Sequence, residues 1–280
     1  MISKAIESLP FLGAGLGYRY QIHDDILANE SEIDFLEIIT EKYIGAPART
    51  IDSLAEMAEK FTIIPHGVSL SVGSARKVSK TFLSNVKEVV DILNAPYYSD
   101  HLATTECPGI DLGHLSPIQY SEVTLKYTID NINMVQDTLG IPFVIENITK
   151  TLEIPGSTMS EEEFLHQLVD KTGCGMLLDV TNLYTNSVNF GFDALERAKQ
   201  LPLNTVVQAH LAGGIWHHGK LIDSHSEAIP NQVWQLFERL IPFMPIKGAL
   251  IERDDNYPDF NELLSEVRMS KDLLNTITPR

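Results

Sequence analysis

Short apolar runs alternate with longer helix-like segments along the chain, and this alternation repeats eight times. The apolar runs are nearly continuous, as in FVIEN, MLLDV and GALIE, which is typical of parallel strands buried on both faces. Eight such units without a long interruption favour a closed barrel over an open sheet. The pattern predicts strands at residues 11–19, 33–39, 61–70, 97–103, 142–148, 175–184, 205–214 and 247–256.

Helix-like stretches separate most of these strands. Ser160 followed by Glu163 is typical of a helix N-terminus, and Gly140 and Gly173 stand where helices should end. The connection at residues 21–32 is short for a helix. No linker or repeat interrupts the series, so we expect a single α/β domain over residues 1–280, a (β/α)8 TIM barrel. Helices are predicted at residues 50–60, 77–94, 120–139, 160–172 and 232–241.

Composition and charge exclude several classes of protein. The 38 acidic residues exceed the 21 basic ones by 17, which argues against nucleic-acid binding. No apolar run approaches the roughly 18 residues of a membrane helix, and the N-terminus lacks the features of a signal peptide. We therefore expect a cytoplasmic protein without a membrane partner. Cys107 and Cys174 form no C-x-x-C pair, so a metal would be held mainly by nitrogen and oxygen.

Ionisable or amide side chains break six consecutive predicted strands at their C-terminal ends. In a barrel these ends meet at the catalytic face, so the side chains are expected to share one cavity. Three of the 9 histidines occupy corresponding points of three strands. The residues at these ends are His66, Asp100, His101, Glu146, Asn147, Asp179, His210 and Glu252.

Such a cluster of histidines and carboxylates would be costly as bare buried charge. Metal ions supply the missing positive charge, and imidazole with carboxylate suits iron, manganese or zinc. Because carboxylates can bridge ions, this many ligands indicates more than one ion. The plainer alternatives stay open: hydrogen-bonded core histidines, and Glu146 or Glu252 paired with Arg253 or a lysine.

The segment after the seventh predicted strand adds two candidates. Asp223 and His225 are two residues apart, so in an extended segment they point to the same side. The alternative is a plain polar turn. Asn182 could complete their site with its amide oxygen, whereas Asp100 and Asn147 alternate away from the cavity and are expected to support the ligands from behind.

Three other histidines have no firm assignment. His217 and His218 lie in a glycine-rich loop, where contact with a substrate is one interpretation. His114 belongs to the long loop at residues 104–119, which is placed to cover the site.

A set of motifs resembles one known family, the multinuclear non-heme iron-dependent oxidative enzymes. That family includes the methanobactin-biosynthesis enzyme and others that modify ribosomally made peptides. The resemblance runs in the family's order from about Gly13 to Asn256. The motifs are GAGLGYR, DFLEI, HGVSLSVGS, SDHLA, IEN, LLDVTNLY, HLAGG, LIDSH and LIERDDN.

The resemblance implies a xylose isomerase-like barrel with two or three iron ions in mixed Fe(II) and Fe(III) states. Glu146, which is able to bridge two ions, is expected to be catalytic together with His210 and Glu252. The matching ligands are His66, His101 and Glu146 for one iron, Asp179, His210 and Glu252 for a second, and Asn182, Asp223 and His225 for a third.

The resemblance also implies the reaction. Dioxygen would serve as co-substrate in the oxidation of a residue of a precursor peptide, often Cys, in other members Asp or an aromatic residue. Many members work with a separate partner protein that captures the peptide; direct binding of a leader peptide at the barrel rim is the alternative. The inserted Gly113-His114 and the Thr181 of DVTN depart from the family pattern near the expected mouth, so the substrate stays open.

Two other classes remain as alternatives. A divalent-metal sugar isomerase or epimerase on the same barrel would not need Asp223 and His225 as a further ligand pair. A non-catalytic metal-binding barrel would not need the complete ligand set.

Overall fold

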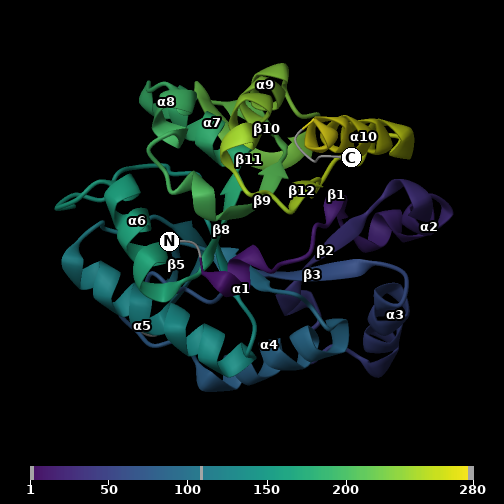
Figure 1. The fold of residues 1–280 in the computed structure, drawn as a ribbon, viewed down its shortest axis with the longest axis horizontal. Coiled ribbons are helices and arrows are strands. Elements are labelled where there is room, and N and C mark those ends of the chain that lie inside the picture. Colours follow the sequence, from purple (N-terminus) through teal and green to yellow (C-terminus); the bar gives the residue numbers. More distant parts are fainter. Residues whose placement is uncertain (1–2, 108–109, 277–280) are drawn as a thin grey trace.

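A closed parallel barrel forms the centre of the structure, a computed structural model that describes residues 3–107 and 110–276. The strands pair in the order β1–β12–β9–β8–β7–β4–β3–β2, and helices surround them (Figure 1). The barrel expected from the sequence is confirmed. Its strands are β1 (Gly13–Gly17), β2 (Phe35–Ile39), β3 (Thr62–Gly67), β4 (Tyr98–His101), β7 (Phe143–Glu146), β8 (Gly175–Asp179), β9 (Val206–Leu211) and β12 (Gly248–Ile251).

All five predicted helices form, with small shifts at their ends. Ser160 accepts a hydrogen bond from the Glu163 backbone N–H, and Gly140 and Gly173 end their helices in the left-handed conformation, as the sequence indicated. The helices are α1 (Lys4–Glu7), α2 (His23–Ala28), α3 (Ala48–Ala58), α4 (Lys80–Leu93), α5 (Glu122–Leu139), α6 (Glu161–Thr172), α7 (Val180–Phe190), α8 (Ala194–Ala198), α9 (Asn231–Leu240) and α10 (Phe260–Asn275). Short 3-10 turns occur at Tyr20–Ile22, Glu30–Glu32, Thr40–Lys42, Leu203–Thr205 and Ile241–Phe243. None of the described helices is long and apolar enough to cross a membrane.

The predicted strand at residues 175–184 is wrong in its second half. Strand β8 ends at Asp179, whose side chain accepts a hydrogen bond from the Asn182 backbone N–H at 2.7 Å and so begins helix α7. The run looked like one strand because α7 is buried on most of its faces, which removes the polar face that usually marks a helix. Helix α10 was also missed, although Leu263, Leu264 and Val267 bury one face at helical spacing.

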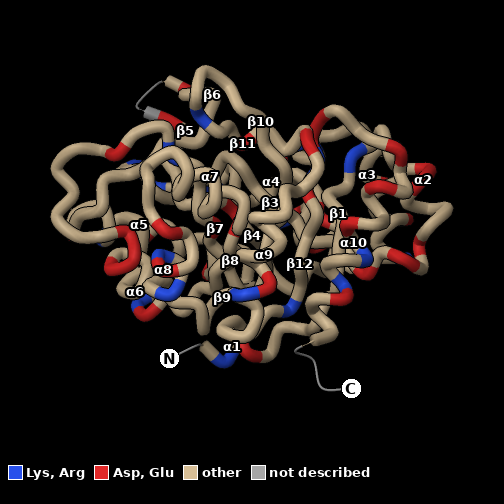
Figure 2. Tube along the Cα trace, turned by 90° about the horizontal axis from the view of Figure 1, so that it is seen from above, with Lys and Arg blue, Asp and Glu red and all other residues tan. Residues whose placement is uncertain are grey.

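Two antiparallel hairpins extend from the C-terminal ends of the barrel strands. The first pairs β5 (Thr104–Cys107) with β6 (Ile110–Ser116), and the second pairs β10 (Gly213–His217) with β11 (Lys220–Glu227). Figure 2 shows both hairpins at one end of the molecule and α1 at the other. The hairpins therefore border the mouth into which the strand ends open.

Candidate metal centre

The barrel interior changes from apolar to polar over one pleat. The lower half is filled by apolar and aromatic side chains, among them Phe35, Ile64, Val144, Leu177 and Leu250. Successive side chains of a strand alternate between faces, so the residue two positions later points into the same interior. These residues are Glu37, His66, Glu146, Asp179 and Glu252, all buried. The two-residue period thus places a layer of ionisable groups directly above the apolar core.

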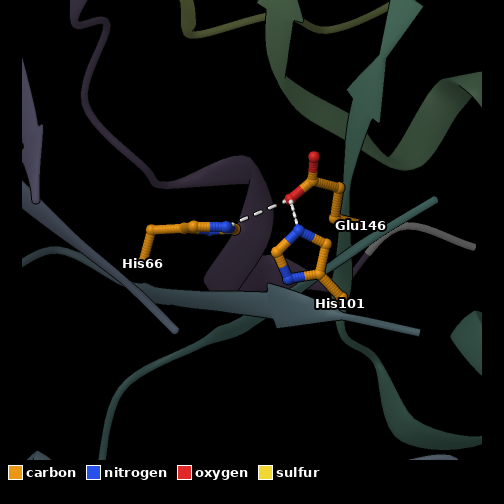
Figure 3. Close-up of side chains that lie close together, drawn as sticks. All are labelled: His66, His101 and Glu146. Carbon is orange, nitrogen blue, oxygen red and sulfur yellow. Dashed lines mark ion pairs between the residues drawn. The ribbon is translucent and has the colours of Figure 1, made fainter. Parts of the chain in front are cut away.

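His66, His101 and Glu146 form the first group, which Figure 3 shows. The Nε2 atoms of His66 and His101 lie 3.3 and 3.2 Å from Oε2 of Glu146. The opposite nitrogen of each ring has its own partner: Nδ1 of His66 lies 2.9 Å from Ser99 Oγ, and Nδ1 of His101 donates to the Gly67 carbonyl at 3.2 Å. Donation from Nδ1 leaves Nε2 of His101 free to bind a cation beside Glu146.

His210 joins this group to the next strand end. Its Nδ1 lies 3.4 Å from Oε1 of Glu146 and 3.2 Å from Oε2 of Glu252. Its Nε2 lies 3.0 Å from Oε1 of Glu37 on β2, a carboxylate that also accepts a hydrogen bond from Gln208 at 2.6 Å. His210 therefore turns one nitrogen toward the ligand cluster and the other toward a buried carboxylate behind it.

His225 enters the same cavity from the hairpin strand β11. Its φ of 49° is in the left-handed region, which is rare for a residue other than glycine and often marks a functional position. Its Nε2 lies 2.7 Å from Asp223, and its Nδ1 lies 3.3 Å from Glu252 and 3.2 Å from Asp254. Arg19 binds Asp254 and lies 3.4 Å from Glu252, so it contacts both carboxylates that lie beside Nδ1 of His225.

Ligand atoms able to hold a cation fall into three adjoining groups, with the atoms of each group within 4.8 Å of one another. The first and second groups share Glu146, and the second and third share Asp179. Compared with the grouping implied by the resemblance, Glu252 falls in the group of His225 and Glu146 in that of His210, although Glu252 also lies 3.2 Å from His210. The groups are His66, His101 and Glu146; Glu146, Asp179 and His210; and Asp179, His225 and Glu252.

Asn182 and Asp223 line the same cavity, and Asp223 is not a member of the three groups, which consist of His, Asp and Glu side chains. The amide oxygen of Asn182 accepts a hydrogen bond from Thr149, and its amide nitrogen donates to the Asn147 carbonyl. Asn147 also exchanges two hydrogen bonds with the backbone of Asp179, and Asp100 accepts from the backbone N–H groups of Leu70 and His101. Both therefore hold strand ends in place through backbone hydrogen bonds, and their support of metal ligands stays a prediction.

Several buried polar atoms of this cluster have no hydrogen-bond partner among the described residues. They are Glu146 Oε2, Asp179 Oδ2, His210 Nδ1, Asp223 Oδ1 and His225 Nε2. Four of the five lie within 3.4 Å of another atom of the cluster without making a hydrogen bond to it. Buried polar atoms without a hydrogen bond are rare in folded proteins because each costs free energy. These five are nitrogen and oxygen atoms of one cluster of adjoining side chains, so the residues fit metal ions.

The pKa values show the same excess of negative charge. Burial alone would lower the pKa of His101, but Glu146 and Asp100 outweigh it and raise that pKa to about 9. Burial, followed by the charges of Asp223 and Glu146, raises the pKa of Asp179 well above its usual range. The cluster thus retains protons when no cation is present, and a bound metal would take their place.

The comparisons with known proteins agree with this geometry. A family model described as "RiPP precursor modification enzyme MbnB/TglH/ChrH" matches residues 13–275. The chain belongs to this family. Its relatives include a UPF0276 protein of Rhizorhabdus wittichii, 36% identical over 93% of this chain and 94% of that protein. A UPF0276 protein of Haemophilus influenzae is 35% identical over 91% of this chain and 92% of that protein.

Solved structures with a similar fold are sugar-isomerase-type barrels. D-psicose 3-epimerase with D-fructose has a TM-score of 0.61 at 13% identity and covers 95% of this chain and 99% of that one. A xylose isomerase domain protein of Alicyclobacillus acidocaldarius has a TM-score of 0.59 at 15% identity, with 94% and 99% covered. At such low identity the likeness shows the fold alone. The expected xylose isomerase-like TIM barrel is thus confirmed.

Sequence reasoning missed Glu37, the carboxylate behind His210. The signal was present, because Glu37 breaks the apolar run of DFLEI just as the other acidic residues break theirs. Arg19 and Asp254 were missed as well, since an ion pair between residues 235 positions apart leaves no local pattern. Of the unassigned histidines, His114 lines the metal-centre cavity, whereas His217 and His218 are exposed near the tip of the second hairpin.

Cys174 lies apart from the metal centre and is buried. Burial raises the pKa of its thiol to about 11, so little thiolate forms at neutral pH. We expect iodoacetamide to leave Cys174 unmodified in the native protein and to label it after denaturation. Peptide mass spectrometry would test this, and rapid labelling of native protein at Cys174 would contradict it.

Proposed function

We propose that this protein is an iron-dependent, dioxygen-using enzyme that modifies a residue, often Cys in this family, of a ribosomally synthesised precursor peptide. Membership of a family of precursor modification enzymes supports a peptide substrate. The observation that supports a centre of several metal ions is the series of three ligand groups, in which neighbouring groups share Glu146 or Asp179. Shared carboxylates hold cations close together, as a multinuclear centre requires.

Nitrogen and carboxylate ligands with no cysteine suit iron, which would supply redox chemistry with dioxygen when bound. The residues we assign as ligands are His66, His101, Glu146, Asp179, Asn182, His210, Asp223, His225 and Glu252. Glu146, His210 and Glu252 lie at the junction of the groups and are the residues we expect to matter most for the reaction.

The space above the ligands is suited to a peptide side chain. A cavity of about 410 Å³ opens over the three groups and is lined partly by the hairpins. Lys150 and Lys220 lie on its wall, and His114 and Leu115 reach it from the first hairpin. A residue of a peptide could enter from the mouth, be oriented by these side chains, and be screened from water by the hairpins. We propose a separate peptide-binding partner protein, or leader binding at the rim, as the means of capture.

The test begins with protein purified without oxygen. We expect more than one iron per chain by metal analysis, and oxygen uptake that depends on a precursor peptide encoded beside this gene. Mass spectrometry of that peptide should show a mass change that requires oxygen. A sugar epimerase would instead interconvert ketoses with manganese or magnesium and without oxygen. That result, or a chain that binds no iron, would sink the proposal.

A further inference from the structure

A second cavity, of about 700 Å³, lies between the barrel wall and helix α3. Ile38 and Ile63, on the outer face of the barrel, line it together with Leu54 and Met57 of α3. All four side chains are buried and form an apolar floor. The cavity adjoins the metal-centre cavity, because Ile39 lines both.

The cavity arises from the short first helix of the outer ring. Helix α2 has six residues and spans about 9 Å, whereas α4, α5 and α10 have 14, 18 and 16 residues. Figure 1 shows α2 and α3 well separated at the edge of the molecule, beside β2 and β3. The connection that looked too short for a helix in the sequence therefore leaves room for a cavity beside the barrel wall, although Ile38 and Ile63 of that wall are buried.

The lining of this cavity is unusual for so acidic a protein. Arg19, Lys42 and Arg49 line it, and no Asp or Glu of the described chain does, although acidic residues outnumber basic ones by 38 to 21 overall. Arg19 is engaged by Glu252 and Asp254. Lys42 and Arg49 are exposed, and within the described ranges neither has a carboxylate at ion-pair distance, although the charge of Asp254 reaches Lys42. Two cations are thus available to a ligand that enters from solvent.

We propose that this cationic cavity, formed by Arg19, Lys42 and Arg49 above the apolar floor, binds a carboxylate-bearing segment of the peptide substrate. The inference rests on the proposed function, since it takes the ligand to be part of the molecule whose modified residue lies in the metal-centre cavity. The carboxylate is either the C-terminal one or that of an acidic side chain. Paired cations favour an anion, while the apolar floor and the rings of Tyr18 and Tyr43 favour an organic group over free phosphate.

Arg19 connects the two cavities, because it lines one and contacts a residue that lines the other. Its guanidinium lines the cationic cavity and lies 3.4 Å from Oε1 of Glu252, whose other oxygen faces His210 and His225. A peptide anchored by a carboxylate beside Arg19 would therefore present a neighbouring residue to the ligand groups. Such anchoring contributes to rate by fixing the position of the reacting residue.

Three tripeptides with a blocked N-terminus serve as probes for binding to the protein as purified. One ends in Leu-Tyr-Glu with an amidated C-terminus, one in Leu-Tyr-Leu with a free C-terminal carboxylate, and one in Leu-Tyr-Gln amide without any charge. We expect one acidic probe to bind about tenfold or more tightly than the neutral one in calorimetric or NMR titrations. The acidic probe that is preferred identifies the source of the carboxylate.

Lys42→Gln/Arg49→Gln should abolish this preference, and Arg49→Gln alone should reduce it. Lys126→Gln/Arg239→Gln is the matched control, because it removes the same charge from exposed positions on α5 and α9 and should keep the preference. Absence of any preference in the unaltered protein would overturn the proposal. So would a preference that survives in Lys42→Gln/Arg49→Gln, or one that the control removes equally.

Iron content separates this proposal from the function on which it rests. If iron binds and a peptide is oxidised but the acidic probes show no preference, the cationic-cavity proposal falls and the function stands. If the preference depends on Lys42 and Arg49 but no iron binds, the proposed function falls and the cavity remains a carboxylate site.

Discussion

We expect Glu146→Ala to lose most of its bound iron and all detectable turnover. Glu146 lies within 3.4 Å of three histidine rings and is shared by two of the three ligand groups, so its removal opens both sites at once. The loss of iron affinity should exceed the roughly 10- to 100-fold that follows removal of a residue behind a ligand. Metal analysis and oxygen uptake would measure the two effects, and His210→Ala should behave in the same way.

Glu238→Ala is the control for this variant, because it removes an exposed carboxylate from helix α9. It should keep its iron and its activity. Thermal unfolding of the metal-free proteins would show whether Glu146→Ala is folded, and Glu146→Gln, which keeps the volume of the side chain, provides a second variant. Full activity with normal iron content in a folded Glu146→Ala protein would show that Glu146 is not a ligand of the metal centre.

We expect Glu37→Gln to bind iron roughly 10- to 100-fold more weakly, in a folded protein. Glu37 accepts from Nε2 of His210, which keeps Nδ1 free on the side of Glu146 and Glu252. A neutral amide holds this tautomer less firmly and makes the ring a weaker donor. Glu37 is a positioning residue, so the spectroscopic signature of the iron, such as its Mössbauer parameters, should change along with affinity.

Glu41→Gln is the matched control for Glu37→Gln. Glu41 follows the same strand and is largely buried, but its carboxylate accepts from the Val68 backbone N–H at 2.8 Å and has no contact with His210. It should leave the iron spectrum unaltered. If Glu37→Gln lowers only the melting temperature and leaves affinity and spectrum as they were, Glu37 has a purely structural role.

The barrel could be predicted because each buried parallel strand is a nearly continuous run of apolar residues in the sequence. One error, at the end of β8, lies where burial removes periodicity, whereas α10 was missed although its apolar residues keep helical spacing. Helix α7 carries no polar face, so its first residues read as an extension of β8. Asp179 ends the strand through a side-chain hydrogen bond to the N–H of Asn182, an interaction that apolar periodicity does not reveal.

The polar layer was also visible in part. Each acidic or histidine residue that interrupts a strand's apolar run near its end signals a buried polar site, and this rule identified His66, Glu146 and Asp179. The same rule applies to Glu37, but the sequence analysis included this residue only in the motif DFLEI and did not assign it to the site. The contacts between these residues could not be predicted from the sequence, because partners such as His210 and Glu37 are 173 positions apart.

The sequence by itself determined the barrel, the end of the barrel that carries the ionisable groups, and most of the residues in that layer. These follow from local periods: apolar runs define strands, and two-residue alternation decides which side chains point inward. Only the tertiary structure decided how the groups share Glu146 and Asp179, that Glu37 lies behind His210, and that a cationic cavity opens beside α3. Those features depend on the closure of the barrel and on the packing of helices around it, which bring together residues that no local pattern relates.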